Sequence, residues 1–241
     1  MRYLIFSDIH GNDLALEALL KSDYPQSCDY LVSLGDMIAI GPSGERVVQL
    51  LKTIPNLIAI KGNHERYLLE GFDNPGSCTE KNHQDWVKAN LTKDSVDFIE
   101  SLPFMVMKED HNLKILFTHY AMRCHHHYKS IIHNPSYEAL DEMYRNSMMM
   151  RDNGYPDIIC YGHEHFPLTY IEDVAYVNPG SLGCPSKGEC VARAVILNVN
   201  AEGFTLEPIA IKYDIKPLIE KIEKTNMPDG EFIKNNFFAS K

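Results

Sequence analysis

The sequence predicts an α/β protein in which two packed sheets form one layered core. Two observations support this fold class. Short apolar runs alternate with helix-like stretches over the first two thirds of the chain, as in strands connected by helices. From Leu168 onward, β-type stretches follow one another with only turn residues between them. No repeat, low-complexity segment or linker divides the 241 residues, so we expect a single domain over 1–241.

Five short apolar runs share one pattern, because each is nearly continuous and ends at a polar residue. They cover residues 3–6, 30–34, 57–60, 114–117 and 157–161. Continuous apolar runs of this length predict strands that are buried on both faces, as in a sheet covered by other layers.

Helix-like stretches lie between several of these runs. Asn12 or Asp13 can cap a helix that continues to about Leu20. Further helices are expected over 44–53, over 79–100 (one or two helices) and over 136–151.

The C-terminal third is predicted to contain antiparallel strands that form a second sheet or the edge of one. The expected strands are 168–172, 175–178, 193–199 and 204–212. A helix over 214–225 and then a polar tail complete the chain. Residues 207–241 lie outside the motifs described below and are expected to form a strand and helix extension of the same domain.

Composition and charge exclude several classes of protein. Hydrophobic residues make up 44% and charged residues 23% of the chain, an ordinary globular balance. The formal net charge of −10 argues against extended nucleic acid as a partner, because an acidic surface repels phosphate backbones. No apolar run approaches the roughly 18–20 residues of a membrane span. Because Asp8 and His10 also interrupt any signal-peptide core, we expect a cytoplasmic protein without a membrane partner. Nothing in the sequence supports an oligomer.

The six cysteines are scattered and form no Cys-x-x-Cys pair. They are Cys28, Cys78, Cys124, Cys160, Cys184 and Cys190. This pattern indicates neither a zinc knuckle nor a redox dithiol. In a reducing cytosol we expect six free thiols, several of them buried.

Polar side chains that suit a metal follow the five predicted strands. They are Asp8, His10, Asp36, Asn63, His64, His119, His163 and His165. Because ligands bind at the carboxyl ends of parallel strands, we expect these side chains to converge at one edge. Carboxylate, amide and imidazole groups together suit Mn, Fe, Zn or Ni, whereas calcium prefers a site made almost only of oxygen.

The spacing of these residues supports one cluster. Asp8 and His10 are two positions apart, as are His163 and His165, so in an extended chain each pair points to one side. A glycine precedes three of the candidates and allows a sharp turn and a close approach to a ligand. Two ions in contact need about seven or eight ligands, and this set supplies seven metal-capable groups and His64.

Each short pattern alone is typical of a capped turn, but their ordered combination is specific. Asp8-x-His10, Gly35-Asp36, Gly62-Asn63-His64-Glu65, His119 and Gly162-His163-x-His165 resemble the five motifs of the calcineurin-like metallophosphoesterases. The resemblance runs from residue 3 to about residue 184 and includes the stretch Asn178-Pro179-Gly180-Ser181. It implies a four-layered α/β/β/α sandwich of two mixed sheets. It also implies two divalent metal ions per chain, with Mn²⁺ as the first choice and Fe, Zn or Ni as alternatives.

The resemblance also implies a role for each motif residue. One metal takes Asp8, His10 and His165, the other takes Asn63, His119 and His163, and Asp36 bridges them. His64 is no ligand in this pattern and acts beside the phosphoryl group as an electrostatic stabiliser or general acid. Asp36 and His64 are thus the expected catalytic residues, and Asn63 and His64 are also expected to bind the substrate. The implied reaction is hydrolysis of phosphodiester or phosphomonoester bonds in small or nucleotide-type substrates by a metal-activated hydroxide.

The segment after Asp36 separates branches of this family. The arginine in the Asp-Arg-Gly motif of Ser/Thr protein phosphatases is absent here. The form Gly35-Asp36-x-x-x-x-Gly41-Pro42 is closer to small bacterial YfcE-like phosphodiesterases, many of which carry cysteine in place of His64. The alternatives are a protein phosphatase or a dinucleoside polyphosphate hydrolase. A non-catalytic scaffold, as in a retromer subunit of the superfamily, is disfavoured because every ligand is present.

Residues 120–133, which follow His119, concentrate cationic and titratable groups. Arg123, His125 and His127 are candidates for binding the substrate over the metals, and Tyr128 is a candidate for stacking on a base. A polar loop without a role is the alternative of equal weight. The remaining single histidines are expected to be structural or exposed: His83, His111 and His133.

Overall fold

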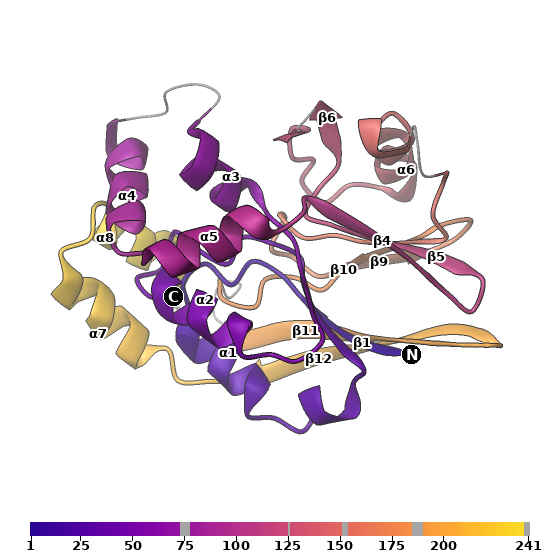
Figure 1. The fold of residues 1–241 in the computed structure, drawn as a ribbon, viewed down its shortest axis with the longest axis horizontal. Helices are drawn as coiled ribbons and strands as arrows, with labels where there is room; N and C mark the ends of the chain where they lie inside the picture. Colours follow the sequence, from indigo (N-terminus) through magenta and orange to yellow (C-terminus); the bar gives the residue numbers. More distant parts are fainter. Residues whose placement is uncertain (73–77, 125, 151–153, 185–189, 239–241) are drawn as a thin grey trace.

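Two five-stranded mixed sheets pack face to face, and helices cover their outer faces (Figure 1). The computed structural model describes residues 1–72, 78–124, 126–150, 154–184 and 190–238. The strand order is β12-β11-β1-β2-β3 in the first sheet and β4-β5-β8-β10-β9 in the second. This arrangement confirms the expected α/β/β/α sandwich.

The first sheet combines three parallel strands with a C-terminal hairpin. The parallel strands are β1 (Arg2–Phe6), β2 (Tyr30–Ser33) and β3 (Leu57–Ala59), and the hairpin is β11 (Val191–Asn200) and β12 (Gly203–Lys212), with β11 antiparallel to β1. Leu4 and Phe6 of β1 pack against the helices, whereas Tyr3 and Ile5 face the second sheet. Because both faces are buried, the run is apolar without interruption.

The second sheet is mixed in the same way. Its parallel strands are β5 (Leu113–Thr118), β8 (Ile158–Cys160) and β10 (Ala175–Asn178), flanked by antiparallel β4 (Met105–Asp110) and β9 (Leu168–Ile171). The prediction is corrected at two strands. The strand β10 was predicted to be antiparallel to its neighbours, but it pairs in parallel with β8. The strand β4 was not predicted, because its edge position leaves it half-buried, with charged residues at one end. A small ribbon of β6 (Met122–Cys124) and β7 (His127–Tyr128) was also not predicted.

The helices confirm most of the predicted boundaries. The predicted helices are present as α1 (Asp13–Leu20), α2 (Gly44–Lys52), α4 (Cys78–Ala89) and α5 (Lys93–Ser101), and the 3₁₀ turn η1 (Pro25–Ser27) was not predicted. Asn12 caps α1, since its Oδ1 accepts a hydrogen bond from the N–H of Ala15 at 3.1 Å. The helix expected over 136–151 is shorter: α6 (Tyr137–Arg145) ends before Asn146 and Ser147, which favour turns, and the 3₁₀ turn η2 (Met148–Met150) follows.

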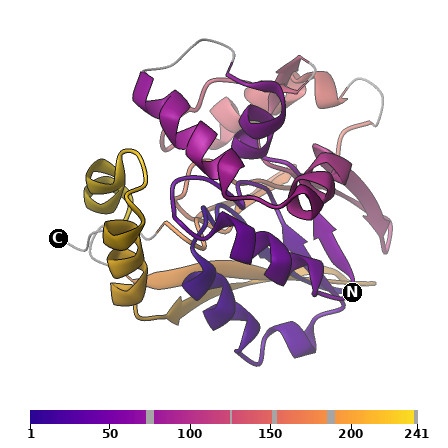
Figure 2. The same cartoon turned by 60° about the vertical axis from the view of Figure 1, so that its left-hand side comes forward.

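The C-terminal segment folds back beside α4 instead of forming a polar tail (Figures 1 and 2). It forms α7 (Lys216–Thr225), α8 (Gly230–Ile233) and the π-helical turn η3 (Lys234–Phe238). The tail prediction was wrong because Met227, Ile233 and Phe238 are apolar and are buried against α7. The imidazole Nδ1 of His83 in α4 lies 3.2 Å from the carbonyl oxygen of Pro228, which ties the two segments together.

None of the helices in the described residues is long and apolar enough to span a bilayer. Five cysteines in this part of the chain are free thiols, and Cys160 and Cys184 are buried. The side chain of Cys78 lies outside the described residues.

Candidate metal centre

The predicted ligands extend from the carboxyl ends of strands in both sheets. Asp8 and His10 follow β1, Asp36 follows β2, Asn63 follows β3, His119 follows β5, and His163 and His165 follow β8. A parallel bridge between Ser7 and Ser181 joins the two sheets at this edge. The ligands therefore meet between two sheets, not along the rim of one sheet as the sequence suggested.

Backbone conformation differs from the prediction at five of these residues. Positive φ angles occur at Asp8 (54°), His10 (49°), Asp36 (52°), His163 (76°) and His165 (63°). The i, i+2 pairs therefore converge through left-handed turns and not through extended chain. Such conformations cost about 1–3 kcal/mol each in a non-glycine residue and persist where the surroundings enforce them, as at binding sites.

Two glycines allow the strand ends to approach each other closely. A Cβ atom at Gly62 would collide with the carboxylate of Asp36, and one at Gly162 would lie 2.8 Å from Oδ2 of Asp8. A side chain at either position would therefore displace one of the predicted metal-binding carboxylates.

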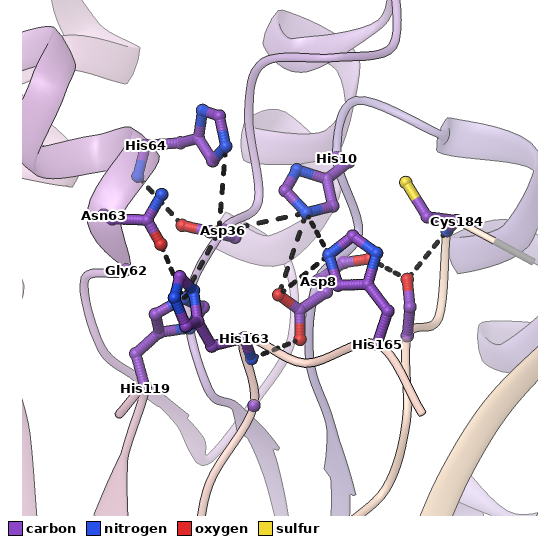
Figure 3. A network of polar contacts seen from close by, with 12 residues as sticks. Asp8, His10, Asp36, Gly62, Asn63, His64, His119, His163, His165 and Cys184 are labelled. Carbon is purple, nitrogen blue, oxygen red and sulfur yellow. Dashed lines mark hydrogen bonds and ion pairs between the residues drawn. The ribbon is translucent and has the colours of Figure 1, made fainter. Parts of the chain in front are cut away.

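One group of side chains gathers around His10 (Figure 3). The Nε2 atom of His10 lies 3.0 Å from Nε2 of His165 and 3.7 Å from Oδ1 of Asp8. It also lies 3.8 Å from Oδ2 of Asp36. Oδ1 of Asp8 and the Nε2 atoms of His10 and His165 thus face one another, and the carboxylate of Asp36 lies beside them.

A second group gathers around His119 (Figure 3). The Nε2 atom of His119 lies 2.9 Å from Oδ1 of Asn63 and 3.2 Å from Nδ1 of His163. It lies 3.3 Å from Oδ2 of Asp36, the same carboxylate oxygen that faces His10. Asp36 is therefore shared by the two groups.

The separations around His119, and the 3.0 Å between His10 and His165, fit atoms that surround an ion, whereas the two carboxylate oxygens lie somewhat farther from His10. With metal–ligand bonds of about 2.1 Å, neighbouring ligands lie about 3.0–3.4 Å apart. Oδ1 of Asp8 is fully buried and has no hydrogen-bond partner in the described part of the chain. Buried polar atoms normally have a partner, so this atom indicates one that the protein itself does not supply.

Hydrogen bonding fixes the orientation of His119. Its Nδ1 lies 2.8 Å from the carbonyl oxygen of Leu34 and donates its hydrogen to it. Nε2 is left to face the cluster, as in a histidine oriented for metal binding.

The charges of the cluster also suit a cation. Burial lowers the pKa of His10 well below its usual value and that of His163 to about 3, so both imidazoles have a free lone pair near pH 7. Burial alone would lower the pKa of His119, but Asp36 and Asp8 raise it to about 9. Burial raises the pKa of Asp36, but His119 and His64 hold it well below its usual range. A metal ion at Nε2 of His119 would replace the proton that now pairs with Asp36.

His64 lies at the open side of the cluster. Its Nε2 is 4.0 Å from Oδ2 of Asp36, and its side chain is 21% exposed. Its backbone N–H donates to Oδ1 of Asp36 at 2.9 Å. The side-chain amide nitrogen of Gln84 lies 3.3 Å from Nδ1 of His64. No sequence motif indicates Gln84, because it stands on α4, outside every motif.

Glu65 belongs to the motif Gly62-Asn63-His64-Glu65, but the motif alone does not indicate its role. The carboxylate is fully buried and accepts hydrogen bonds from the backbone N–H groups of Asp36 (2.8 Å), Met37 (2.9 Å), Ile38 (3.2 Å) and Gly62 (2.7 Å). It thereby fixes the turns that present Asp36 and Asn63. Glu65 also caps α3 (Asn63–Glu70), a helix that was not predicted. A glutamate at the third position is a known signal for the start of a helix, so the sequence did contain an indication of α3.

Glu65→Gln is expected to lower the free energy of unfolding by about 2–3 kcal/mol, because an amide NH₂ group would face backbone N–H groups that then lack an acceptor. Urea denaturation of the metal-free protein measures the change. The matched control is Glu207→Gln at an exposed position, where a change within about 0.5 kcal/mol is expected. A loss below 1 kcal/mol in Glu65→Gln would show that the carboxylate does not hold these turns.

The loop 120–133 reaches the cluster through Tyr128, and neither Arg123 nor His127 contributes. Arg123 is exposed, His127 is half-buried, and neither is among the described residues that line the cavity over the cluster. His125 lies outside the described residues. Tyr128 instead packs its ring 5.5 Å from that of His119, and its hydroxyl donates to the carbonyl oxygen of Lys61 at 2.8 Å.

The other single histidines behave as predicted. His83 is buried and structural, since its Nε2 accepts a hydrogen bond from the N–H of Ile40 at 3.0 Å. His111 and His133 are exposed.

Comparison with known proteins supports the same family as the motifs. The model of the calcineurin-like phosphoesterase superfamily domain matches residues 1–202. An uncharacterized protein of Methanocaldococcus jannaschii is 26% identical over 93% of each chain. Serine/threonine-protein phosphatase 2 of Escherichia coli is 27% identical over 73% of this chain and 86% of its own. A solved structure of a hypothetical protein from Pyrococcus horikoshii OT3 has the same fold, with a TM-score of 0.80, 18% identity and coverage of 100% of this chain and 99% of its own. With its family model spanning most of the chain, this protein belongs to the calcineurin-like phosphoesterase superfamily.

Proposed function

We propose that the chain hydrolyses phosphoester bonds of small substrates with two divalent metal ions held between its sheets. The single observation that carries this proposal is the position of Asp36, whose Oδ2 lies 3.8 Å from Nε2 of His10 and 3.3 Å from Nε2 of His119. Asp8, His10 and His165 would hold one ion, Asn63, His119 and His163 the other, and Asp36 would bridge them. When bound, two such ions neutralise phosphate oxygens and lower the pKa of a water that can then attack phosphorus.

The remaining steps fall to side chains around the cluster. The amide of Gln84 donates to Nδ1 of His64, which leaves the hydrogen of the neutral imidazole on Nε2, facing the cavity. There it can donate a hydrogen bond to a phosphoryl oxygen. To protonate the leaving group, His64 would first have to be in the imidazolium form, whose Nδ1 hydrogen would face the side-chain oxygen of Gln84 instead of its nitrogen. Asn63 lies beside the same face and would contact the phosphoryl group.

Small phosphodiesters are the preferred substrates in this proposal, and phosphomonoesters are the alternative. The segment after Asp36 lacks the arginine of the protein phosphatase motif, which favours the former. The similarity to a bacterial serine/threonine-protein phosphatase favours the latter. Mn²⁺ is the proposed ion, and the nitrogen and oxygen ligands also accept Fe, Zn or Ni.

Metal-stripped protein should be inactive, and Mn²⁺ should restore hydrolysis of bis-p-nitrophenyl phosphate to a greater extent than hydrolysis of p-nitrophenyl phosphate. Zn²⁺, Ni²⁺ and Mg²⁺, added one at a time, would rank the metals. A higher rate with p-nitrophenyl phosphate would indicate that the protein prefers phosphomonoesters and acts as a phosphatase. Two bound ions without hydrolysis of either compound would contradict the proposed activity and favour a scaffold.

A further inference from the structure

A cavity of about 380 Å³ opens directly over the candidate metal centre, within the range of small-ligand sites. One wall is the centre itself, formed by His10, Asp36, Asn63, His64, His163 and His165. The facing wall comes from α3, α4 and the C-terminal segment. A substrate whose phosphoryl group lies at the centre would therefore place its other end against this facing wall.

Four aromatic rings line the facing wall. Tyr67 stands on α3 and Phe72 follows the end of that helix, with ring centroids 4.6 Å apart. Phe232 and Phe237 come from the C-terminal segment, with ring centroids 6.4 Å apart. The ring of Tyr67 lies 5.8 Å from that of His64, so the aromatic surface begins beside the predicted general acid. Phe232 is 62% exposed at the rim, although it is a large apolar side chain.

The charges of this wall are negative. Glu80 and Asp229 line the cavity, and none of the described lining residues is a lysine or arginine. The guanidinium carbon of Arg66 lies 4.8 Å from the ring centroid of Tyr67, but Arg66 is 3% exposed and is not one of the lining residues. Aromatic faces beside a carboxylate attract organic cations, whereas a second phosphate would meet the like charge of Asp229.

We propose that the substrate is a small phosphoester that carries an organic ammonium group, which binds against Tyr67, Phe72, Phe232 and Phe237 with Asp229 opposite its charge. This inference rests on the proposed function, since it requires the phosphoryl group at the metal centre. It excludes dinucleoside polyphosphates as preferred substrates, because their further phosphates have no cationic partner on this wall.

Two matched esters test the charge alone: p-nitrophenyl phosphorylcholine and p-nitrophenyl 3,3-dimethylbutyl phosphate, in which carbon replaces the quaternary nitrogen. Both have the same leaving group and nearly the same shape. We expect kcat/KM with Mn²⁺ to be about tenfold higher for the choline ester, a size typical of cation–π and carboxylate contacts at partly exposed sites. Diadenosine tetraphosphate should be hydrolysed more slowly than either ester.

Variants of the wall assign the effect to named residues. Asp229→Asn and Phe232→Leu should each reduce the tenfold ratio to about threefold or less. Asn tolerates the left-handed φ of 60° at position 229, and position 232 is exposed, so both variants should fold. Glu220→Gln on α7 makes the same charge change outside the cavity and should keep the tenfold ratio.

A binding measurement provides a readout that does not depend on turnover. In ligand-observed NMR with the metal-free protein, choline should bind at least fivefold more tightly than 3,3-dimethylbutanol, and Asp229→Asn should remove this preference. Equal binding of the two alcohols, or equal turnover of the two esters while bis-p-nitrophenyl phosphate is hydrolysed, would overturn the inference and leave the proposed function standing. Failure to hydrolyse any of these esters with any metal would contradict the proposed function, while the NMR result would still decide whether the wall binds ammonium groups.

Discussion

Asp36→Asn is expected to abolish turnover, with a fall in kcat of at least about 10³-fold, and to reduce bound metal from two ions per chain to one or none. Oδ2 of Asp36 faces both His10 and His119, at 3.8 and 3.3 Å, so one substitution weakens both groups of ligands. An amide also lacks the negative charge that offsets two dications. Metal content by mass spectrometry and hydrolysis of bis-p-nitrophenyl phosphate measure the two effects.

The control for Asp36→Asn is Asp97→Asn on α5, which removes one carboxylate charge at an exposed position far from the motifs. It should retain two ions and full activity. Circular dichroism should show that both variants are folded. If Asp36→Asn retained two ions and normal turnover, Asp36 would not bridge the two groups.

The ligand set could be predicted from the sequence because each ligand stands next to a strong local signal. A buried strand is recognisable by its continuous apolar run, and the polar residue that ends the run has to lie at the edge of the sheet. Asp36 and His119 illustrate this, since each follows a fully buried strand end. Gly62 and Gly162 add a second signal, because a side chain at either position would displace a ligand.

The features that the sequence did not reveal depend on contacts between distant segments. The left-handed backbone at His10 and His163 is enforced by neighbouring loops, and no local pattern indicates it. Gln84 faces His64 only because α4 packs beside α3. The aromatic wall requires the C-terminal segment to fold back, which depends on the burial of residues such as Phe238 against α7 and not on any periodic pattern near them.

His64→Ala is expected to retain both metal ions but to lower kcat by about 10²–10⁴-fold, the usual range for loss of a general acid or of a donor to developing charge. His64 is the side chain best placed for this role, because its Nε2 faces the cavity 4.0 Å from Asp36 while the amide of Gln84 holds Nδ1. In the proposed arrangement His64 donates a hydrogen to the substrate and does not bind a metal ion. Its removal should therefore leave the metal content unchanged.

Leaving-group dependence distinguishes a general acid from an electrostatic role for His64. A series of aryl methyl phosphates with leaving-group pKa values from about 4 to about 10 should show a steeper dependence of kcat on that pKa in His64→Ala than in the wild type, because poor leaving groups need the proton most. Gln84→Ala keeps the imidazole but removes its orienting amide, so it should show a smaller loss in kcat with metal content unchanged. Equal losses across the series in His64→Ala would exclude proton donation and leave His64 with electrostatic stabilisation alone.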